Sequence, residues 1–155
     1  QGNYQIHYEP GESRSSMFGG NSNWRGPIWL PLNYMIIQSL RKYYSFYGEK
    51  YTYEFPTGSG NKMNLKEIAN EITKRLIKLF ERNAEGKFHY HADTPGEHFS
   101  KDEHFKDLHL FYEFFDGDNG KGLGASHQTG WTALIANLIM EMDLDEWERT
   151  AGNHL

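Results

Sequence analysis

Apolar residues recur every three or four positions in three separate segments of the chain, and this spacing predicts three long α-helices. The first predicted helix covers residues 31–47. Pro27 and Pro31 stand at its beginning, where a missing backbone N–H is tolerated, and Gly48 stands at its end, where glycine commonly closes a helix. Its apolar positions are Ile28, Leu32, Met35, Ile36, Leu40 and Tyr43.

The second predicted helix, over residues 64–83, has the most regular pattern in the chain. Asn64 is expected to cap its first turn, and Glu67, three residues later, to complete a capping box. Gly86 is expected to close the helix. Its apolar face consists of Leu65, Ile68, Ala69, Ile72, Leu76, Leu79 and Phe80.

The third predicted helix covers residues 130–146, and Gly152 is expected to stop it. Its apolar face consists of Trp131, Leu134, Ile135, Leu138, Ile139 and Met142. Because long helices joined by glycine-rich loops dominate this pattern, the sequence predicts an all-α protein with long loops and minor short strands.

The segments between the predicted helices are short or irregular. The alternating run Tyr4–Tyr8 predicts a short strand, and the aromatic run Tyr51–Phe55 predicts either a strand or an extended arm. Leu108–Phe114 fits either a strand or a helical turn, and residues 116–124 are expected to form a loop. The stretch Phe88–Lys106 has no period, so it is expected to be a long irregular segment, which is usually functional when ordered.

Charge and composition narrow the classes of partner. The 155 residues suffice for one domain, and the net charge of −5 comes without any basic run, which argues against nucleic acid as a partner. No apolar run reaches the roughly 18 residues that span a bilayer, so no membrane partner is expected. The absence of cysteine excludes disulfides and cysteine-ligated metals. The compartment is open, with a cytoplasmic location as the expectation.

One carboxylate lies among aromatic residues in the C-terminal half of the chain. Glu113 is flanked by Phe111, Tyr112, Phe114 and Phe115, and a glycine-rich loop follows. A site that cleaves sugars needs a tuned carboxyl group together with flat aromatic faces. On residue chemistry alone, however, a solvated acid between core aromatics is the favoured interpretation.

Further candidate residues lie in the loop before the first predicted helix. Trp24 and Trp29 could stack on sugar faces, although Trp29 lies on an apolar stripe and core packing is the favoured interpretation for it. Core packing is also the favoured interpretation for Trp131, which begins the apolar stripe of the third predicted helix. Arg25 could bind sugar hydroxyls or a carboxylate, or it could form a structural ion pair.

Two alternatives belong to other functional classes. One is a zinc site, because five histidines lie within 21 residues and two of them form a His-x-His pair. The other is a non-catalytic carbohydrate-binding module, which the aromatic residues would serve equally well. Metal analysis of chelator-treated protein tests the zinc site. The presence of an acid partner for Glu113 would distinguish a glycosidase from a binding module. The histidines are His89, His91, His98, His104 and His109, with Asp93, Glu97 and Glu103 among them.

Three blocks of sequence together resemble the C-terminal part of glycoside hydrolase family 63, which includes processing α-glucosidase I. The first block runs from Gly19 to Trp29 and contains Trp-Arg-Gly-Pro, the second is Tyr112-Glu113, and the third runs from Gly122 to Thr132. The resemblance extends from about Tyr4 to Met142. It implies an (α/α)6 barrel, or toroid, and inverting hydrolysis of α-linked glucosides or related α-glycosides.

The same resemblance implies roles for individual residues. Glu113 corresponds to the general base, and the family's general acid is an aspartate upstream of these blocks that nothing in this sequence matches. The expected substrate is an oligosaccharide or small glycoside, with no metal and no cofactor. The residues expected to bind it are Trp24, Arg25, Trp29, Tyr112, His127 and Trp131.

A chain that holds only one of the two catalytic carboxyl groups is expected to be part of a larger protein. The chain begins Gln1-Gly2-Asn3 without an initiator methionine, so residues 1–155 are expected to be a C-terminal fragment of a glycosidase domain that is inactive alone. Apolar helix faces of a partial toroid would be left uncovered. A homodimer of the isolated chain is therefore also expected.

Overall fold

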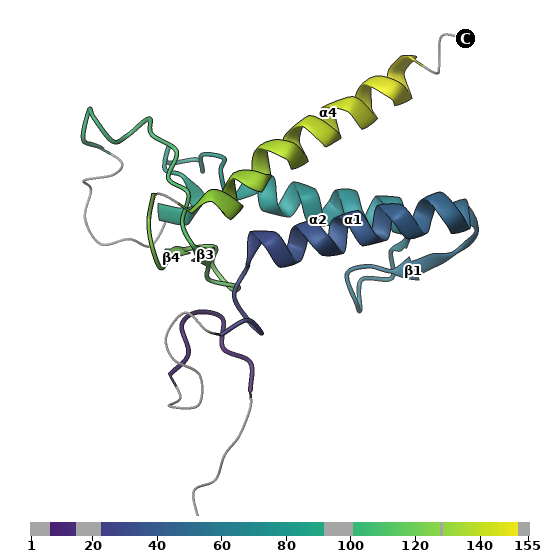
Figure 1. The fold of residues 1–155 in the computed structure, drawn as a ribbon, viewed down its shortest axis with the longest axis horizontal. Helices are drawn as coiled ribbons and strands as arrows, with labels where there is room; N and C mark the ends of the chain where they lie inside the picture. The colour runs from purple at the N-terminus through teal and green to yellow at the C-terminus, as the bar shows by residue number, and fades with distance from the viewer. Residues whose placement is uncertain (1–6, 15–22, 92–100, 128, 152–155) are drawn as a thin grey trace, which may run out of the picture. The chain divides into compact units, whose positions relative to one another are not determined.

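The computed structural model describes residues 7–14, 23–91, 101–127 and 129–151, with side chains up to residue 142. The chain divides into two compact units. We call the first, from residues 1–29 and 80–132, the loop unit, and the second, from residues 30–79 and 133–155, the helical unit. Regular secondary structure is mainly helical (Figure 1), and the described part also contains four short strands.

The helical unit contains the three long helices that the apolar spacing predicts. They are α1 (Leu30–Tyr47), α2 (Leu65–Lys78) and α4 (Leu134–Ala151). Helices α1 and α2 lie side by side, and α4 contacts both (Figure 1). None of the helices in the described part of the chain combines the length and apolarity that crossing a bilayer requires. The apolar residues buried in this unit include Leu30, Ile37, Ile68, Ala69, Leu76, Ile135 and Leu138.

The helix ends follow local chemistry. The Asn64 side chain accepts the backbone N–H of Glu67 at 2.9 Å, and the Glu67 carboxylate accepts the backbone N–H of Asn64 at 2.7 Å, which confirms the predicted capping box. Pro31 occupies the first turn of α1, where proline is tolerated. Helix α1 ends before Gly48, whose φ of 63° suits glycine alone, as predicted.

The predicted end of the second helix was wrong. Helix α2 ends at Lys78 instead of continuing to residue 83, because the chain there folds back into a tight turn. Within that turn the Asn83 N–H donates to the carbonyl of Lys87 at 2.7 Å, and Gly86 adopts a φ of 77°. Gly86 therefore shapes this turn and does not close the helix.

A polar cluster ties α1 to α4. The Glu141 carboxylate accepts hydrogen bonds from the amide of Gln38 at 3.0 and 2.9 Å and forms an ion pair with Arg41. The hydroxyl of Tyr34 completes the set at 3.4 Å. A half-buried carboxylate with this many donors fixes how the two helices pack.

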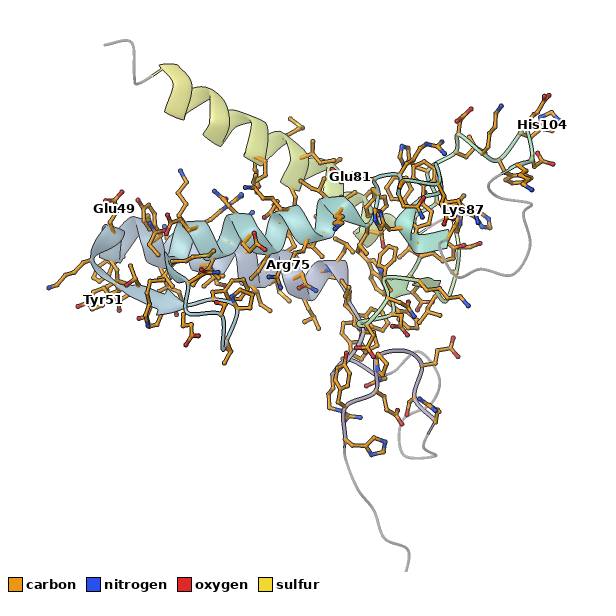
Figure 2. The ribbon with its side chains drawn as sticks, turned by 180° about the vertical axis from the view of Figure 1, so that it is seen from behind. Glu49, Tyr51, Arg75, Glu81, Lys87 and His104 are labelled. Atoms are coloured by element: carbon orange, nitrogen blue, oxygen red, sulfur yellow. The ribbon has the colours of Figure 1, made fainter. Side chains whose placement is uncertain are left out.

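Two strands form a hairpin between α1 and α2. Strand β1 (Thr52–Glu54) pairs antiparallel with β2 (Lys62–Asn64), in a register that sets Tyr53 opposite Met63. This confirms a strand in the aromatic run 51–55. A short helix, η2 (Gly48–Lys50), leads into the hairpin from α1, and Figure 2 shows Glu49 and Tyr51 together at that end of the unit.

In its described residues, the loop unit contains a second small hairpin and two short helices that are described in full. Strand β3 (Phe114–Phe115) pairs antiparallel with β4 (Gly122–Leu123), and Ile28 bridges to Phe115 through two backbone hydrogen bonds of 2.7 and 3.0 Å. The short helices are η3 (His89–His91) and η4 (Gly130–Ala133). The core of this unit is aromatic, and its buried rings are Trp29, Phe88, Tyr90, Tyr112, Phe114 and Phe115.

The remaining sequence predictions had mixed outcomes. Of the run Leu108–Phe114 only the last residue joins a strand, and residues 116–124 contain β4 because Gly122 and Leu123 pair with β3. In the predicted strand Tyr4–Tyr8, the described residues His7 and Tyr8 are not in a strand. The rest of that run, and residues 92–100 of the predicted irregular segment, lie outside the described residues.

Candidate active site

Glu113 stands immediately before β3, and the same neighbouring residue holds its backbone and its side chain. The Glu113 N–H donates to the carbonyl of Ala125 at 2.8 Å. In return, the Ala125 N–H donates to Oε2 of Glu113 at 3.2 Å. The carboxylate is half-buried, so it is oriented by the fold while remaining within reach of a ligand.

Gly124 makes this arrangement possible. Its φ is 70°, and a Cβ placed there would collide with Oε2 and Cβ of Glu113 and lie 3.0 Å from the ring of Phe114. Glycine is therefore needed at this position both for its backbone conformation and for the close approach of the carboxylate. The glycine-rich loop is a packing surface for Glu113 as well as a turn.

Residues 129–132 fix the backbone on both sides of Glu113. The indole N–H of Trp131 donates to the carbonyl of Glu113 at 2.9 Å. The hydroxyl of Thr132, which is fully buried, donates to the carbonyl of Tyr112 at 2.6 Å. These two bonds hold the carbonyl groups of consecutive residues, Tyr112 and Glu113. The position of Glu113 is therefore fixed by a segment that follows it by 16 or more residues in the sequence.

Three tryptophans gather in the loop unit. Trp24 stacks on Trp29 with ring centroids 4.1 Å apart, and Trp29 stacks in turn on Phe114 at 4.5 Å. Trp131 meets Trp24 and Trp29 edge-on, at 6.5 and 5.9 Å. Trp24 and Trp131 are 45% and 39% exposed, so they can offer ring surface to a ligand, whereas Trp29 is 1% exposed and supports Trp24 from behind.

Tyr112, the residue before Glu113, is buried. Its hydroxyl lies 3.0 Å from Nε2 of His91, and its ring lies directly against Gly122. Burial raises the pKa of Tyr112 and lowers the pKa of His91. The side chain of Tyr112 therefore contributes packing and a hydrogen bond inside the loop unit. The sequence pattern did not reveal that His91 is its partner.

Arg25 and His127 are exposed on two different loops of the unit. The backbone N–H of Arg25 donates to the Asn23 side chain at 3.3 Å. The ring nitrogen Nδ1 of His127 lies 3.0 Å from the hydroxyl of Ser126. Both side chains can donate hydrogen bonds to hydroxyl groups, which is the chemistry that a sugar requires.

A buried polar group that sequence reasoning missed orders the loop before Trp24. The side-chain amide of Asn23 donates to the backbone carbonyls of Glu9 and Gly11 at 2.8 and 2.9 Å, and the backbone carbonyl of Asn23 accepts the indole N–H of Trp29 at 2.9 Å. Gly26 lies so close to the Glu9 carbonyl that no side chain fits there. The Trp-Arg-Gly-Pro segment is thus fixed by a buried asparagine that could not be told from a loop residue in the sequence.

Two histidines of the predicted zinc set have partners other than a metal ion. Nδ1 of His89 lies 2.9 Å from the carbonyl of Glu81, and His109 packs on the ring of Phe88 at 4.6 Å. Among the residues that the structure describes, no group of three or more His, Asp or Glu side chains could hold a metal ion. His98, Asp93 and Glu97, which the zinc interpretation included, lie outside the described residues.

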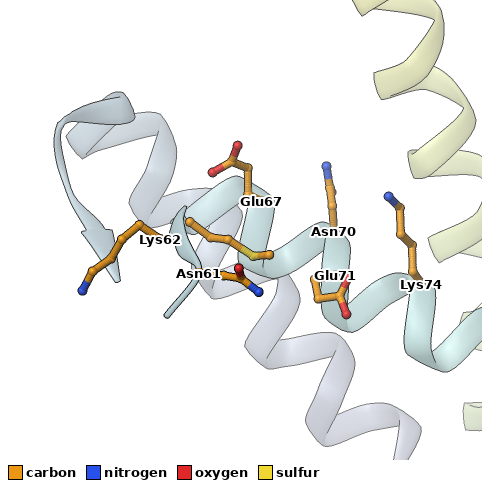
Figure 3. A pocket seen from close by; sticks show the side chains of 7 residues that line it. Asn61, Lys62, Glu67, Asn70, Glu71 and Lys74 are labelled. Atoms are coloured by element: carbon orange, nitrogen blue, oxygen red, sulfur yellow. The ribbon is translucent and has the colours of Figure 1, made fainter. Parts of the chain in front are cut away.

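Open hollows also occur away from Glu113, and two of them are lined by described residues. One, of about 590 Å³, lies on the helical unit along α2 and β2, between residues 61 and 74, as Figure 3 shows. The other, of about 340 Å³, lies in the loop unit and is lined by His7, Tyr8, Glu9 and Arg14. Each contains a held carboxylate, since Glu67 accepts the Asn64 N–H at 2.7 Å and Glu9 accepts the Arg14 N–H at 3.2 Å, but neither is lined by a tryptophan. We therefore place the candidate site at Glu113, in the unit that carries the exposed tryptophan rings.

A fixed carboxylate in the same unit as two exposed tryptophans, one of which binds the backbone of that glutamate, is the type of site that carbohydrate-acting proteins use. The chain belongs to glycosyl hydrolase family 63, since the C-terminal domain of that family matches residues 13–92. That match contains Trp24, Arg25, Trp29 and His91 and ends before Glu113.

Several known proteins are similar to the chain. It is 48% identical to an uncharacterized protein of Saccharomyces cerevisiae over 91% of its own length. It is 27% identical to the mannosyl-oligosaccharide glucosidase of the same yeast over 79% of the chain. It is 30% identical to alpha-glucosidase 2 of Arabidopsis thaliana over 76% of the chain. The chain spans only 13%, 11% and 11% of these three relatives.

Proposed function

We propose that the protein to which this chain belongs hydrolyses α-linked glucosides or related α-glycosides with inversion, and that Glu113 is its general base. The observation that carries the proposal is the fixed Glu113 carboxylate, which accepts the Ala125 N–H at 3.2 Å and rests on Gly124. Two of the similar proteins are named as glucosidases, which agrees with this substrate class.

The mechanism needs two carboxyl groups about 6.5–9.5 Å apart, so that a water molecule fits between the base and the sugar. Glu113 takes a proton from this water while the water oxygen attacks the anomeric carbon. A second carboxylic acid, supplied by another part of the protein, protonates the departing oxygen as its bond to that carbon breaks. The Ala125 N–H orients the base for the first of these steps.

The other site residues divide into two groups. Trp24 and Trp131 present exposed ring surface for the C–H faces of a sugar, and Arg25 and His127 donate hydrogen bonds to its hydroxyls. Trp29 and Tyr112 shape the site from within, since both are buried. The substrate is an oligosaccharide or a small glycoside, and the reaction needs no cofactor.

The architecture belongs to the same proposal. Residues 1–155 form a C-terminal fragment of a glycosidase domain whose complete fold is an (α/α)6 barrel. Helices α1, α2 and α4 are three of its helices, and their mutual contacts support this assignment. The remaining helices then supply the other half of the sugar pocket together with the general acid.

Stereochemistry tests the function directly. The full-length protein is mixed with an α-glucoside, and the anomeric proton signals are followed by NMR. We expect β-glucose to form first and α-glucose to appear only later by mutarotation, while the isolated chain releases almost no sugar. First formation of the α-anomer would mean a retaining reaction and would overturn the proposal.

A non-catalytic carbohydrate-binding module is the second candidate, because the exposed rings of Trp24 and Trp131 suit binding alone. It predicts that the full-length protein binds α-linked oligosaccharides by calorimetry without releasing sugar. The glycosidase proposal predicts both binding and release. The two measurements on one preparation therefore separate the candidates.

A further inference from the structure

A buried hydrogen bond lies one residue away from the proposed base. Nε2 of His91 lies 3.0 Å from the hydroxyl of Tyr112, and the two residues are only 6% and 8% exposed. His91 ends η3, whereas Tyr112 precedes β3 by two residues. The bond therefore joins two segments of the loop unit that are 21 residues apart in the sequence.

Tyr112 is held at both of its ends. At the backbone end, its carbonyl accepts the hydroxyl of Thr132 at 2.6 Å. At the other end, His91 holds its hydroxyl, and the ring between these points packs on Gly122 and on Tyr90, with ring centroids 5.7 Å apart in the second pair. A side chain fixed in this way cannot rotate without disturbing its own peptide unit.

Glu113 is the next residue in the chain, so the position of its carboxylate depends on the position of that peptide unit. The Ala125 N–H donates to its Oε2 at 3.2 Å, which is long for a charge-assisted hydrogen bond. A small displacement of the Tyr112 backbone would lengthen this contact further. The geometry of the base therefore depends on a hydrogen bond that does not touch it.

The chemistry of His91 fits a structural role of this kind. Burial lowers the pKa of its ring, so the ring is neutral and can share a hydrogen bond with the neutral phenol of Tyr112. Removing the ring leaves the buried hydroxyl without this partner, which destabilises the local arrangement more than loss of an exposed bond would.

We propose that His91 is a positioning residue for Glu113 and acts through the hydroxyl of Tyr112. The inference rests on the proposed function, because it concerns the same general base. It assigns a specific task to a histidine whose position in a His-x-His pair suggests a metal ligand.

The test uses four variants of the full-length enzyme: His91→Ala, His91→Gln, Tyr112→Phe and the double variant His91→Ala/Tyr112→Phe. Misplacing a catalytic group by about 1 Å can lower a rate roughly 100-fold, so we expect kcat to fall about 10- to 100-fold in His91→Ala and in Tyr112→Phe. KM should change less than about twofold, because neither side chain is proposed to bind the sugar.

Two comparisons separate positioning from general damage to the fold. His91→Gln places an amide near the position of Nε2 and should recover most of kcat, which a merely space-filling role would not predict. The double variant should be no slower than the slower single variant, because both changes remove one and the same bond. His104→Ala, at an exposed histidine of the loop unit labelled in Figure 2, is the matched control and should keep wild-type kcat.

Glu113→Gln in the same assay distinguishes the possible failures. If Glu113→Gln is nearly inactive while Tyr112→Phe and His91→Ala keep wild-type kcat, the proposed function stands and the positioning inference is wrong. Losses that multiply in the double variant would also overturn the inference, since the two residues would then act separately. If Glu113→Gln itself keeps wild-type kcat, the proposed base is wrong, and the inference is wrong with it.

Discussion

At the scale of single residues, the site is defined by what surrounds one carboxylate. Glu113 receives contacts from Gly124, Ala125 and Trp131, all of which lie in the segment that follows β3. Each contact uses a backbone group or the absence of a side chain. The site is therefore sensitive to changes that look minor in the sequence.

Gly124→Ala is the sharpest change of this kind. The added methyl group meets the Glu113 carboxylate and must push it aside, so we expect kcat of the full-length enzyme to fall roughly 100-fold. Gly86→Ala is the matched control, because Gly86 also has a positive φ, of 77°, but has nothing within 4 Å of the added Cβ. Both variants should lose about 1–2 kcal/mol of stability in thermal unfolding. Equal kcat values for the two variants would contradict the contact between Gly124 and the base.

Sequence reasoning reached some of these residues and missed others for a physical reason. Glu113, Trp24 and Trp131 stand in conspicuous aromatic or glycine-rich blocks, so their residue types alone made them candidates. Asn23 was missed, because it acts through hydrogen bonds to residues distant in the sequence, and such bonds leave no periodic pattern. The burial of Trp29 agrees with the core packing that its apolar stripe favoured.

At the scale of secondary structure, the helices were predictable because their causes are local. Apolar spacing and caps are properties of neighbouring residues, and they located α1, α2 and α4. The end of α2 and strand β4 were missed because each depends on pairing with a partner segment. A two-residue strand containing Gly122 carries no recognisable strand pattern of its own.

Asn64→Ala tests whether the N-terminal cap stabilises α2. Loss of the side chain that accepts the Glu67 N–H should lower the free energy of unfolding by about 0.5–2 kcal/mol, measured by urea denaturation of the chain. Asn64→Ser is the control and should stay close to wild type, since serine is an equally good cap. An Asn64→Ala variant as stable as wild type would show that the capping box does not contribute to stability.

At the scale of the whole molecule, exposed apolar side chains indicate surfaces that need covering. On α1, Met35 and Ile36 are 56% and 51% exposed, and on α4, Met140 is 64% exposed. Soluble monomers rarely leave large apolar patches in water. In the proposed barrel, neighbouring helices of the longer protein would cover these side chains.

The isolated chain is therefore expected to associate with itself, as a symmetric dimer. Sedimentation equilibrium should give twice the chain mass of 18.1 kDa. Met140→Glu places a charge on one of the exposed faces and should shift the chain toward monomer. A mass of 18.1 kDa for the wild-type chain at high concentration would contradict both the dimer and the uncovered barrel faces.

The central claim is that Glu113 is the general base, and the kcat of full-length Glu113→Gln tests it most directly. Glutamine keeps the shape of the side chain but cannot take a proton from water, so kcat on an α-glucoside should fall about 10²- to 10⁴-fold while KM changes little. Glu103→Gln, at an exposed glutamate of the loop unit, should retain wild-type kcat. A Glu113→Gln enzyme that hydrolyses the substrate at the wild-type kcat would contradict the account.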